Sequence, residues 1–336
     1  MTLVVVDADV LGRRRTGDET YVRNLLRELA PLARDAGLRV GAVARRADVV
    51  PEGVEPVELA TSLQELRLAW ALPRALRRIG ASLSHTQYAL PVRPSCPCVV
   101  TVHDVSFARR PELMGRWDRF VFGRVVPRAA RDAARVLTVS ERTKRDLVEL
   151  YEIDPDRVVV TLNGVDPAFR PGDGPRDYAL AVGVVERRKN QLAALEAANA
   201  AGLPLVVAGP EKDAAVAAEL RRRGARLEGW VDTERLAELY RGAACLVQTS
   251  RFEGFGLPAL EAMASGTPVV GIREPALEEV AGAAAVLVDE PDLAEGIRAA
   301  LADRERLVTA GLERSRAFGW RATAELTLAV YQEILA

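Results

Sequence analysis

Residues 250–268 read SRFEGFGLPALEAMASGTP and follow an apolar run at 245–248. Pro258 suits the first position of a helix, and Gly266 suits the residue just past its end. The stretch therefore predicts a strand, a glycine-containing loop and a short helix. This strand-to-helix unit is the one from which doubly wound parallel sheets are built.

Two carboxylates flank the predicted loop. Glu253 precedes it and Glu261 lies in the first or second turn of the helix. Across such a turn both can face one ligand, with one suited to the vicinal hydroxyls of a ribose and the other to a sugar. Alternatively, Glu261 only complements the helix dipole and Glu253 is a solvated loop residue. The backbone amides of the loop and the helix N-terminus form a site for an anion, made by Gly254, Phe255, Gly256 and Leu257.

Strand-like and helix-like stretches alternate through the rest of the chain. This alternation implies parallel sheets with helices on both faces, and therefore an α/β fold. The predicted strands are 3–6, 39–44, 98–102, 136–139, 158–162, 178–182, 204–208, 226–227, 245–248, 268–272 and 285–288. The predicted helices are 19–33, 62–78, 116–133, 141–150, 189–201, 213–223, 233–241, 258–265, 276–281, 291–302 and 314–335, all approximate.

The chain has 336 residues, about twice the ~100–200 expected for one domain. The stretch 167–175 contains three Pro and two Gly and is the predicted linker. We therefore expect one Rossmann-like domain over 1–168 and a second over 174–314. In such folds ligands bind at the carboxyl ends of the strands, here in the cleft between the two domains.

The composition excludes several classes of protein. The formal net charge is −1, so there is no global field to attract nucleic acid. Two His and three Cys cannot build several zinc sites or a disulfide framework. The cysteine usage fits a reducing cytoplasm. No apolar run approaches the ~18–20 residues of a membrane-spanning helix, and the first residues predict a strand rather than a signal peptide.

The motif E-G-F-G-L-P-x-L-E-A-M-A-x-G-x-P-V-V resembles the E-x7-E signature of retaining group-1 (family 4) glycosyltransferases. Further stretches resemble motifs of the same family, in the same order and spacing, across nearly the whole chain. They are VVTVHDVSF at 99–107, LTVSE at 137–141, NGVD at 163–166, GVVERRKN at 183–190 and GWVD at 229–232. The resemblance implies the GT-B architecture of two facing Rossmann-like domains. It also implies a C-terminal helix, 317–336, that crosses back to the first domain.

Arg188 and Lys189 follow a predicted strand and a turn that contains Gly, at the start of a helix. The helix dipole disfavours cations there, which favours an anionic ligand over a merely solvated helix start. Arg binds phosphate bidentately and Lys binds it as a point charge. In the family, the lysine at this place contacts the donor diphosphate. Many relatives carry a further Arg directly after the first Gly, where this chain has Val184.

The resemblance implies transfer of a sugar from a nucleoside-diphosphate sugar, a UDP-, GDP- or ADP-sugar, with the base unspecified. Glu261 is then expected to hold the ribose and Glu253 the donor sugar, while Lys189, Arg188 and the loop amides neutralise the leaving diphosphate. Retention in the family is attributed to same-face attack assisted by the departing phosphate, which requires no nucleophile and acid/base pair. We expect no cofactor and no metal ion, in keeping with the few ligands available.

In the first domain the resemblance places His103 near the reaction centre, in contact with the donor sugar, whereas His85 is predicted to be structural. The loop between the first predicted strand, 3–6, and the first predicted helix, 19–33, departs from the family pattern. Asp18 and Glu19 there satisfy the helix dipole and make a poor phosphate site. We expect this region to shape the acceptor pocket, with an anionic acceptor as one option, through Gly17, Asp104 and Arg15.

Asp7 and Asp9 formally match the D-x-D metal site of the other large glycosyltransferase fold. Because they end the first strand of a Rossmann-like domain, we interpret them as structural or acceptor-side residues rather than as metal ligands.

Residues 116–128 form a predicted helix rich in Arg, Trp and Phe. Basic helices with aromatic residues can lie on anionic membranes, and some relatives dock in this way to reach lipid-linked acceptors. An ordinary surface helix with a buried aromatic face is the alternative. We therefore predict a cytoplasmic enzyme with possible peripheral contact to the inner membrane face, acting on a sugar, lipid-linked or small-molecule acceptor.

Two alternative functions stay open at this point. A GT-B sugar-nucleotide epimerase would release free nucleoside diphosphate or an epimer without an acceptor, although the E-x7-E motif argues against it. A catalytically silent nucleotide-sugar-binding scaffold is disfavoured because both glutamates, the lysine and the histidine are present.

Overall fold

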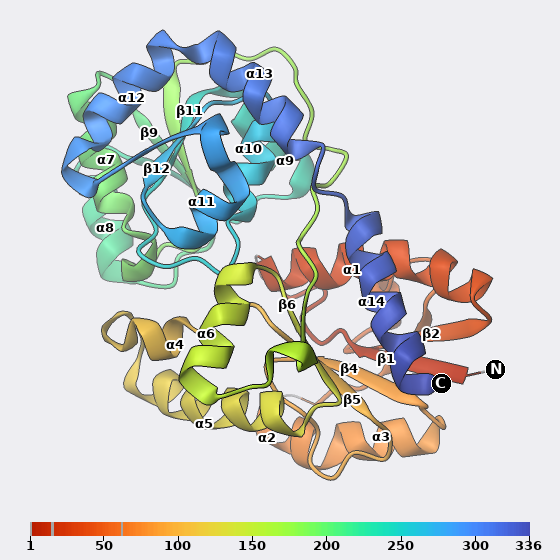
Figure 1. Cartoon of the computed structure of the whole chain (residues 1–336). Helices are drawn as coiled ribbons and strands as arrows, with labels where there is room; N and C mark the ends of the chain where they lie inside the picture. Colours follow the sequence, from red (N-terminus) through yellow and green to blue (C-terminus); the bar gives the residue numbers. More distant parts are fainter. Residues whose placement is uncertain (1, 15–16, 62) are drawn as a thin grey trace. The chain divides into compact units, whose positions relative to one another are not determined.

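The structure is a computed structural model that describes residues 2–14, 17–61 and 63–336. The chain divides into two compact units (Figure 1). The first comprises Met1–Gly164 together with Gly319–Ala336, and the second comprises Val165–Phe318. Each unit is a parallel sheet covered by helices. The predicted fold class, two Rossmann-like doubly wound domains with a C-terminal crossover helix, is confirmed.

The first unit is built on a seven-stranded parallel sheet in the order β3-β2-β1-β4-β5-β6-β7. The central strands are buried almost throughout, which explains why their sequences are apolar without alternation. The strands are β1 (Thr2–Asp7), β2 (Leu38–Ala44), β3 (Glu55–Glu58), β4 (Leu83–Gln87), β5 (Cys98–Val102), β6 (Arg135–Thr138) and β7 (Val158–Val160).

Helices of very different length connect these strands. The longer ones are α1 (Gly17–Asp35), α3 (Leu72–Arg78), α5 (Arg116–Asp132), α6 (Glu141–Tyr151) and α14 (Trp320–Leu335). The shorter turns are η1 (Ala47–Val49), α2 (Gln64–Leu66), the π-helical turn η2 (Arg67–Ala71), α4 (Ser106–Arg109), η3 (Pro111–Leu113) and η4 (Pro155–Arg157).

The second unit has a six-stranded parallel sheet in the order β10-β9-β8-β11-β12-β13. Its strands are β8 (Tyr178–Val182), β9 (Leu205–Ala208), β10 (Arg226–Gly229), β11 (Ala243–Gln248), β12 (Val269–Ile272) and β13 (Ala285–Val288). Its helices and turns are η5 (Arg187–Lys189), α7 (Gln191–Ala200), α8 (Ala214–Arg222), α9 (Thr233–Gly242), α10 (Leu257–Ala264), α11 (Pro275–Ala281), η6 (Gly282–Ala284), η7 (Glu290–Asp292), α12 (Leu293–Ala302) and α13 (Arg304–Ser315).

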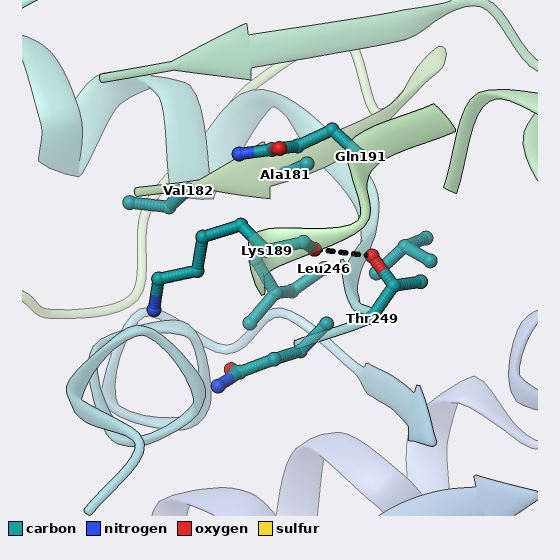
Figure 2. Close-up of a pocket in the computed structure, with 8 residues that line it drawn as sticks. Ala181, Val182, Lys189, Gln191, Leu246 and Thr249 are labelled. Carbon is teal, nitrogen blue, oxygen red and sulfur yellow. Dashed lines mark hydrogen bonds between the residues drawn. The ribbon is translucent and has the colours of Figure 1, made fainter. Parts of the chain in front are cut away.

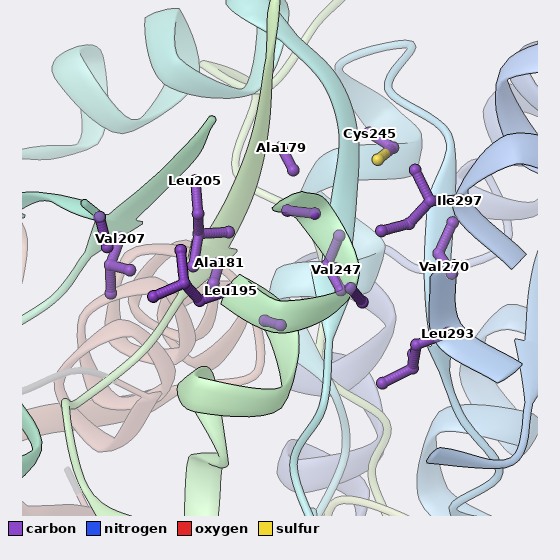
Figure 3. Close-up of a cluster of buried hydrophobic side chains, with 14 of the residues drawn as sticks. Ala179, Ala181, Leu195, Leu205, Val207, Cys245, Val247, Val270, Leu293 and Ile297 are labelled. Atoms are coloured by element: carbon purple, nitrogen blue, oxygen red, sulfur yellow. The ribbon is translucent and has the colours of Figure 1, made fainter. Parts of the chain in front are cut away.

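The core of the second unit lies between its sheet and the helices α7 and α12 (Figure 3). Small residues of β8 leave room for larger side chains of β9 and of the two helices, so the layers interdigitate. The cluster includes Ala179, Ala181, Leu195, Leu205, Val207, Cys245, Val247, Val270, Leu293 and Ile297. This packing holds β8 and β11 side by side, and the loops after these two strands carry the predicted donor site.

The structure corrects several of the predicted elements and contains two strands, β3 and β4, that were not predicted. The strand β4 was not predicted because its sequence LSHTQ is mostly polar, although the residues 83–86 are fully buried. The predicted helix 62–78 is interrupted by the π-helical turn η2. The predicted helix 314–335 corresponds to α14, which begins only at Trp320, and α13 (Arg304–Ser315) was not predicted.

The C-terminal helix α14 packs against α1 in the first unit, and a close backbone contact fixes its start. A Cβ atom on Gly164 would lie 2.1 Å from the backbone nitrogen of Trp320, a distance that no side chain can occupy. One turn further on, the Thr323 hydroxyl donates a hydrogen bond to the carbonyl oxygen of Leu162. Gly164, the glycine of the NGVD motif, therefore lets the start of α14 pack directly against the segment after β7.

We predict that Gly164→Ala destabilises the chain by about 2 kcal/mol or more, because the added methyl group must displace the start of α14. The matched control is Gly319→Ala, at the neighbouring N-cap of α14, where a Cβ atom meets nothing within 4 Å. Its cost should not exceed about 1 kcal/mol. Urea unfolding measures both values, and equal stability of the two variants would contradict the packing role of Gly164.

Candidate active site

Arg188 and Lys189 lie in a tight turn after β8. They are the last two residues of η5, and Asn190 follows in the left-handed conformation with φ of 53° before α7 begins. The two cations thus lie just ahead of the helix rather than in its first turn. The Thr249 hydroxyl, after β11, lies 3.0 Å from the carbonyl oxygen of Lys189 (Figure 2) and 2.9 Å from that of Asn190, so its one hydrogen is shared between these two acceptors. The turn is therefore attached to the end of the neighbouring strand.

Lys189 and Glu253 form a buried ion pair. The distance from Lys189 Nζ to Glu253 Oε1 is 2.6 Å, and the side chains are 12% and 9% exposed. The lysine side chain passes over Gly183, where a Cβ atom would come within 3.2 Å of its Cε. Gly183 also has a φ of 133°, a conformation that favours glycine. Gly183, the glycine of the GVVERRKN motif, therefore leaves the space in which the Lys189 side chain extends to Glu253.

The charge state of Glu253 follows from its neighbours. Burial by itself raises the pKa of this carboxyl, but the charges of Lys189 and Arg188 outweigh the burial and hold the pKa below its usual value. Glu253 is therefore ionised at neutral pH. It is not a solvated loop residue, the alternative that its sequence position allowed.

Arg188 contacts protein groups on two sides. Its Nη1 donates to the carbonyl oxygen of Phe252 at 2.9 Å, and its Nη2 lies 3.0 Å from Glu186 Oε1. The nearest approach to Glu253 is 4.0 Å, from Nη1 to Oε2. The guanidinium thus fixes the segment before Glu253 and adds positive potential to its second oxygen.

The loop after Glu253 leads directly into α10. Gly254 is half-buried, and Phe255 is buried with its ring edge-on to Phe318 at 5.9 Å between centroids. Gly256 adopts a φ of 108°, and Leu257 is the first residue of the helix. The predicted sequence of strand, loop and helix is therefore present, and the helix N-terminus points its first amides into this loop.

Glu261 is buried in a different environment. Its Oε2 accepts a hydrogen bond of 2.8 Å from Tyr240 Oη, and Tyr240 itself is fully buried. Burial raises the pKa of Glu261 to about 8; the Tyr240 hydrogen bond opposes the shift, and the negative charge of Asp166 adds to it. Glu261 is therefore protonated at neutral pH. Among the described residues, no cation pairs with Glu261 as Lys189 pairs with Glu253.

In the first unit His103 follows β5 and is 8% exposed. Its Nε2 lies 2.8 Å from Gln87 Oε1. Since that oxygen can only accept, Nε2 carries the proton and Nδ1 keeps the lone pair. Burial lowers the pKa of His103, so the ring is neutral at pH 7. Tyr21 and Tyr88 contact the ring at 4.7 and 5.4 Å between centroids.

The three predicted acceptor-side residues differ in their surroundings. Asp104 Oδ1 accepts a hydrogen bond of 2.8 Å from the backbone nitrogen of Ser106 and so fixes the start of α4. Gly17 is exposed and is the first residue of α1. Arg15 lies outside the described residues. The structure thus gives Asp104 a role in local backbone geometry, and the acceptor contacts stay predictions.

His85, predicted to be structural, is fully buried. Its Nδ1 lies 2.5 Å from Tyr331 Oη, on α14, and its Nε2 lies 2.7 Å from Thr101 Oγ1, on β5. Burial lowers the pKa of His85 to about 3. This neutral histidine therefore connects the C-terminal helix to the middle of the first sheet.

Asp7 and Asp9 are bound by arginines. The guanidinium of Arg67 reaches both oxygens of Asp7 at 2.6 and 2.5 Å, and Arg45 and Arg13 contact Asp9 at 2.9 and 2.7 Å. Such pairing suits a structural role, which was one of the two interpretations of this motif. Within the described ranges, no three His, Cys, Asp or Glu side chains gather in a way that could hold a metal ion.

Sequence reasoning missed two residues of this region. Gln248 ends β11 and donates a hydrogen bond of 3.1 Å to Glu253 Oε1. It was included only as the last residue of an apolar strand, although a polar residue at the carboxyl end of such a strand is itself a signal. Tyr240 lies in α9, and nothing in its sequence pattern distinguishes it from a core aromatic.

The fold defines a class of protein: a two-domain α/β protein of the GT-B type, in which Arg188, Lys189 and Glu253 form a charged cluster after β8 and β11. Comparison with known proteins agrees with this class. The family model for group 1 glycosyl transferases matches residues 168–314, and that for glycosyltransferase family 4 matches residues 15–169.

Individual relatives match over most of their length. The chain is 31% identical to the O-antigen chain mannosyltransferase B of Escherichia coli, over 82% of this chain and 80% of that protein. It is 29% identical to the MMP alpha-(1->4)-mannosyltransferase of Mycolicibacterium hassiacum, over 95% of each chain. The chain therefore belongs to the group 1 (family 4) glycosyltransferases, and it is a glycosyltransferase that uses a nucleotide-sugar donor. The epimerase and scaffold alternatives are not favoured.

Solved structures share the fold. Sucrose-phosphate synthase from Thermosynechococcus elongatus superimposes with a TM-score of 0.78 at 21% identity, over 99% of both chains. Anabaena HepE, in complex with UDP and glucose, superimposes with a TM-score of 0.72 at 15% identity, over 99% of this chain and 100% of that one.

We predict that Glu261→Gln changes the pH dependence of stability. Because the native state holds the Glu261 proton up to about pH 8 and the unfolded chain loses it near pH 4.3, wild-type stability falls as pH rises between these values. The variant lacks this loss. Its free energy of unfolding relative to wild type should therefore increase from pH 5 to pH 8, by at most about 1.4 kcal/mol per pH unit.

Urea unfolding at several pH values measures this difference. Glu313→Gln, which changes an exposed carboxylate in α13, is the control and should give a constant difference. A constant difference for Glu261→Gln as well would show that this carboxyl is ionised in the folded chain.

Proposed function

We propose that this chain is a retaining glycosyltransferase whose donor lies along the carboxyl ends of β8 and β11. Lys189 and Arg188, with the amides of residues 254–257, bind the diphosphate. Glu253 binds the transferred sugar, and Glu261 binds the ribose. The family resemblance assigns to His103 a contact with the donor sugar.

The observation that carries this proposal is the 2.6 Å contact between Lys189 and Glu253. In a nucleotide sugar the anomeric carbon is bonded directly to the β-phosphate. A cation for the phosphate and a carboxylate for the sugar must therefore be neighbours, as Lys189 and Glu253 are. An ammonium group has three N–H donors, and the contact with Glu253 occupies only one.

Charge placement then accounts for the chemistry. Departure of the nucleoside diphosphate develops negative charge on the β-phosphate. Lys189 and the N-terminal amides of α10 stabilise this charge in a partly buried site, where electrostatic interactions are strong. The retained configuration follows if the acceptor hydroxyl attacks from the face that the phosphate leaves and passes its proton to the departing phosphate oxygen. We propose that this electrostatic assistance suffices without a metal ion.

Glu253 contributes to the same step in its ionised form. A carboxylate accepts hydrogen bonds from sugar hydroxyls and its negative charge favours positive charge that develops at the anomeric centre. His103 is neutral, and its Nδ1 offers an acceptor rather than a proton. The site therefore acts through fixed charges and hydrogen bonds more than through proton transfer.

For the acceptor side we propose peripheral contact with an anionic membrane through α5. Trp117 and Phe120 are 70% and 54% exposed, and their rings stack at 6.0 Å between centroids. Arg124 covers the Phe120 ring at 4.0 Å, and Arg116 and Arg119 are exposed beside it. Exposed aromatic side chains ringed by arginine suit the headgroup region of a bilayer.

The exposure of Trp117 and Phe120 supports the membrane interpretation of residues 116–128 over an ordinary surface helix with a buried aromatic face. In the described part of the chain, no helix is long and apolar enough to cross a bilayer.

We predict different defects for two donor-site variants. Lys189→Ala should weaken nucleoside-diphosphate binding about 10- to 100-fold, the value of one charge-assisted hydrogen bond. Glu253→Ala should retain this binding and lower transfer about 100-fold or more. Calorimetry with UDP, GDP and ADP and a turnover assay separate the two effects.

Lys212→Ala is the control, because Lys212 is exposed and pairs only with Glu186 in the described structure. Unchanged affinity in Lys189→Ala would overturn the diphosphate assignment, and full transfer by Glu253→Ala would overturn the sugar assignment.

We predict that the chain sediments with vesicles that contain phosphatidylglycerol but not with phosphatidylcholine vesicles. Replacing Arg116, Arg119 and Arg124 by Ala should weaken the association about 100-fold, because each basic residue near an anionic surface contributes about 1 kcal/mol. The control removes equal charge from the second unit, at Arg221, Arg222 and Arg223, and should sediment like wild type. The membrane proposal is wrong if the wild-type chain stays in solution with both kinds of vesicle.

A further inference from the structure

Gln248 occupies an unusual position for a polar side chain. It is the last residue of β11, which lies between β8 and β12 in the second sheet, and it is 6% exposed. The residues before it on the strand are apolar and buried. With Lys189, Gln191 and Thr249 it lines a small pocket at the carboxyl ends of β8 and β11, seen in Figure 2.

The amide of Gln248 has a defined partner. Its Nε2 donates to Glu253 Oε1 at 3.1 Å, and Lys189 Nζ donates to the same oxygen at 2.6 Å. The orientation of the amide is fixed, since turning it over would place its oxygen against a carboxylate oxygen. Lys189 and Gln248 thus both hold Oε1, and the Ser250 side chain is a further hydrogen-bond partner of the carboxylate. In the described part of the chain, Oε2 has no cation closer than Arg188, at 4.0 Å.

The side-chain oxygen of Gln248 indicates that this residue type is present for function rather than for packing. Gln248 Oε1 is buried and has no hydrogen-bond partner among the described residues. A buried acceptor without a partner lowers stability, which an apolar side chain of similar size would avoid. The residue type at this position is therefore better explained by its bond to Glu253 than by packing.

We propose that Gln248 is the positioning residue for Glu253: it holds Oε1 so that Oε2 faces the sugar of the donor. The inference rests on the proposed role of Glu253. Lys189 alone is a poor anchor, because a bound diphosphate draws the same ammonium group away from the carboxylate. Gln248 is neutral and does not compete for the phosphate, so it keeps Glu253 in place when Lys189 serves both groups.

The test is Gln248→Met, which keeps the volume and removes the amide. The probe is whichever of the UDP-, GDP- and ADP-linked hexoses most stabilises wild type in a thermal-shift screen, and turnover is read as nucleoside-diphosphate release. We expect kcat to fall about tenfold, the value of one hydrogen bond to a charged group, with nucleoside-diphosphate affinity within twofold of wild type. The acid limb of the kcat profile should move to higher pH, because the lost N–H donor favoured ionised Glu253.

Two further variants guard against a merely structural effect. Gln191→Met makes the same change in the same pocket, but the Gln191 amide donates to the carbonyl oxygen of Val184, so the acid limb should stay in place. Gln248→Glu can donate to Glu253 only while one of the two carboxyls is protonated. Its turnover should therefore decline as pH rises, opposite to the change in Gln248→Met.

The outcomes separate this inference from the proposed function. Full turnover by Glu253→Ala removes the role of Glu253 and this inference with it. An inactive Glu253→Ala, together with wild-type turnover and pH profile in Gln248→Met and Gln248→Glu, overturns the role of Gln248 alone. An equal shift of the acid limb in Gln191→Met would show that the pocket, and not the bond to Glu253, sets the profile.

Discussion

A carboxylate that stays ionised inside a protein must be paired, and the second unit is organised around this requirement at Glu253. Lys189 reaches it from the turn after β8, and Gln248 from the end of β11. Arg188 binds the backbone just before it. Because β8 and β11 are neighbours in the sheet, these groups converge without a long loop. The packing of the core against β8 and β11 thus determines the distances among Lys189, Gln248 and Glu253.

The two glutamates of the E-x7-E motif show how environment divides one residue type into two states. Both are buried to a similar degree, but Glu253 has cations beside it and Glu261 has a tyrosine hydroxyl and the charge of Asp166. One is ionised and the other protonated at neutral pH. A ribose that donates two hydroxyl hydrogens to Glu261 favours its ionised form, so we expect nucleotide binding to release a proton there. Sequence spacing places both side chains near one loop, but only their neighbours decide their charge.

Much of the fold could be predicted from sequence, because buried parallel strands are continuous apolar runs and glycine or proline marks their ends. The strands 98–102, 178–182 and 285–288 were predicted with the bounds that the structure gives. β4 was missed because Ser84, His85 and Thr86 find hydrogen-bond partners or burial only through tertiary contacts.

The candidate site was predictable to the extent that its residues lie in motifs. Lys189 and Glu253 were both predicted, but they are 64 residues apart, and their direct pairing depends on the order of strands in the sheet. Gln248 and Tyr240 act through other side chains, and no local pattern reports such contacts. The break at η2 and the late start of α14 follow from tertiary packing, since Arg67 turns inward to Asp7 and the backbone of Trp320 packs against Gly164.

The chain leaves the first unit at Gly164 and returns to it at Gly319. Its last helix therefore completes the unit with which it began, through the packing of α14 on α1 and the bond between Tyr331 and His85. During synthesis from the N-terminus, the second unit is whole as soon as Phe318 has emerged, whereas the first still lacks one of its helices. The ribosome thus delivers the later unit ready to fold before the earlier one, and His85 Nδ1 lacks its partner, Tyr331, until α14 has been translated.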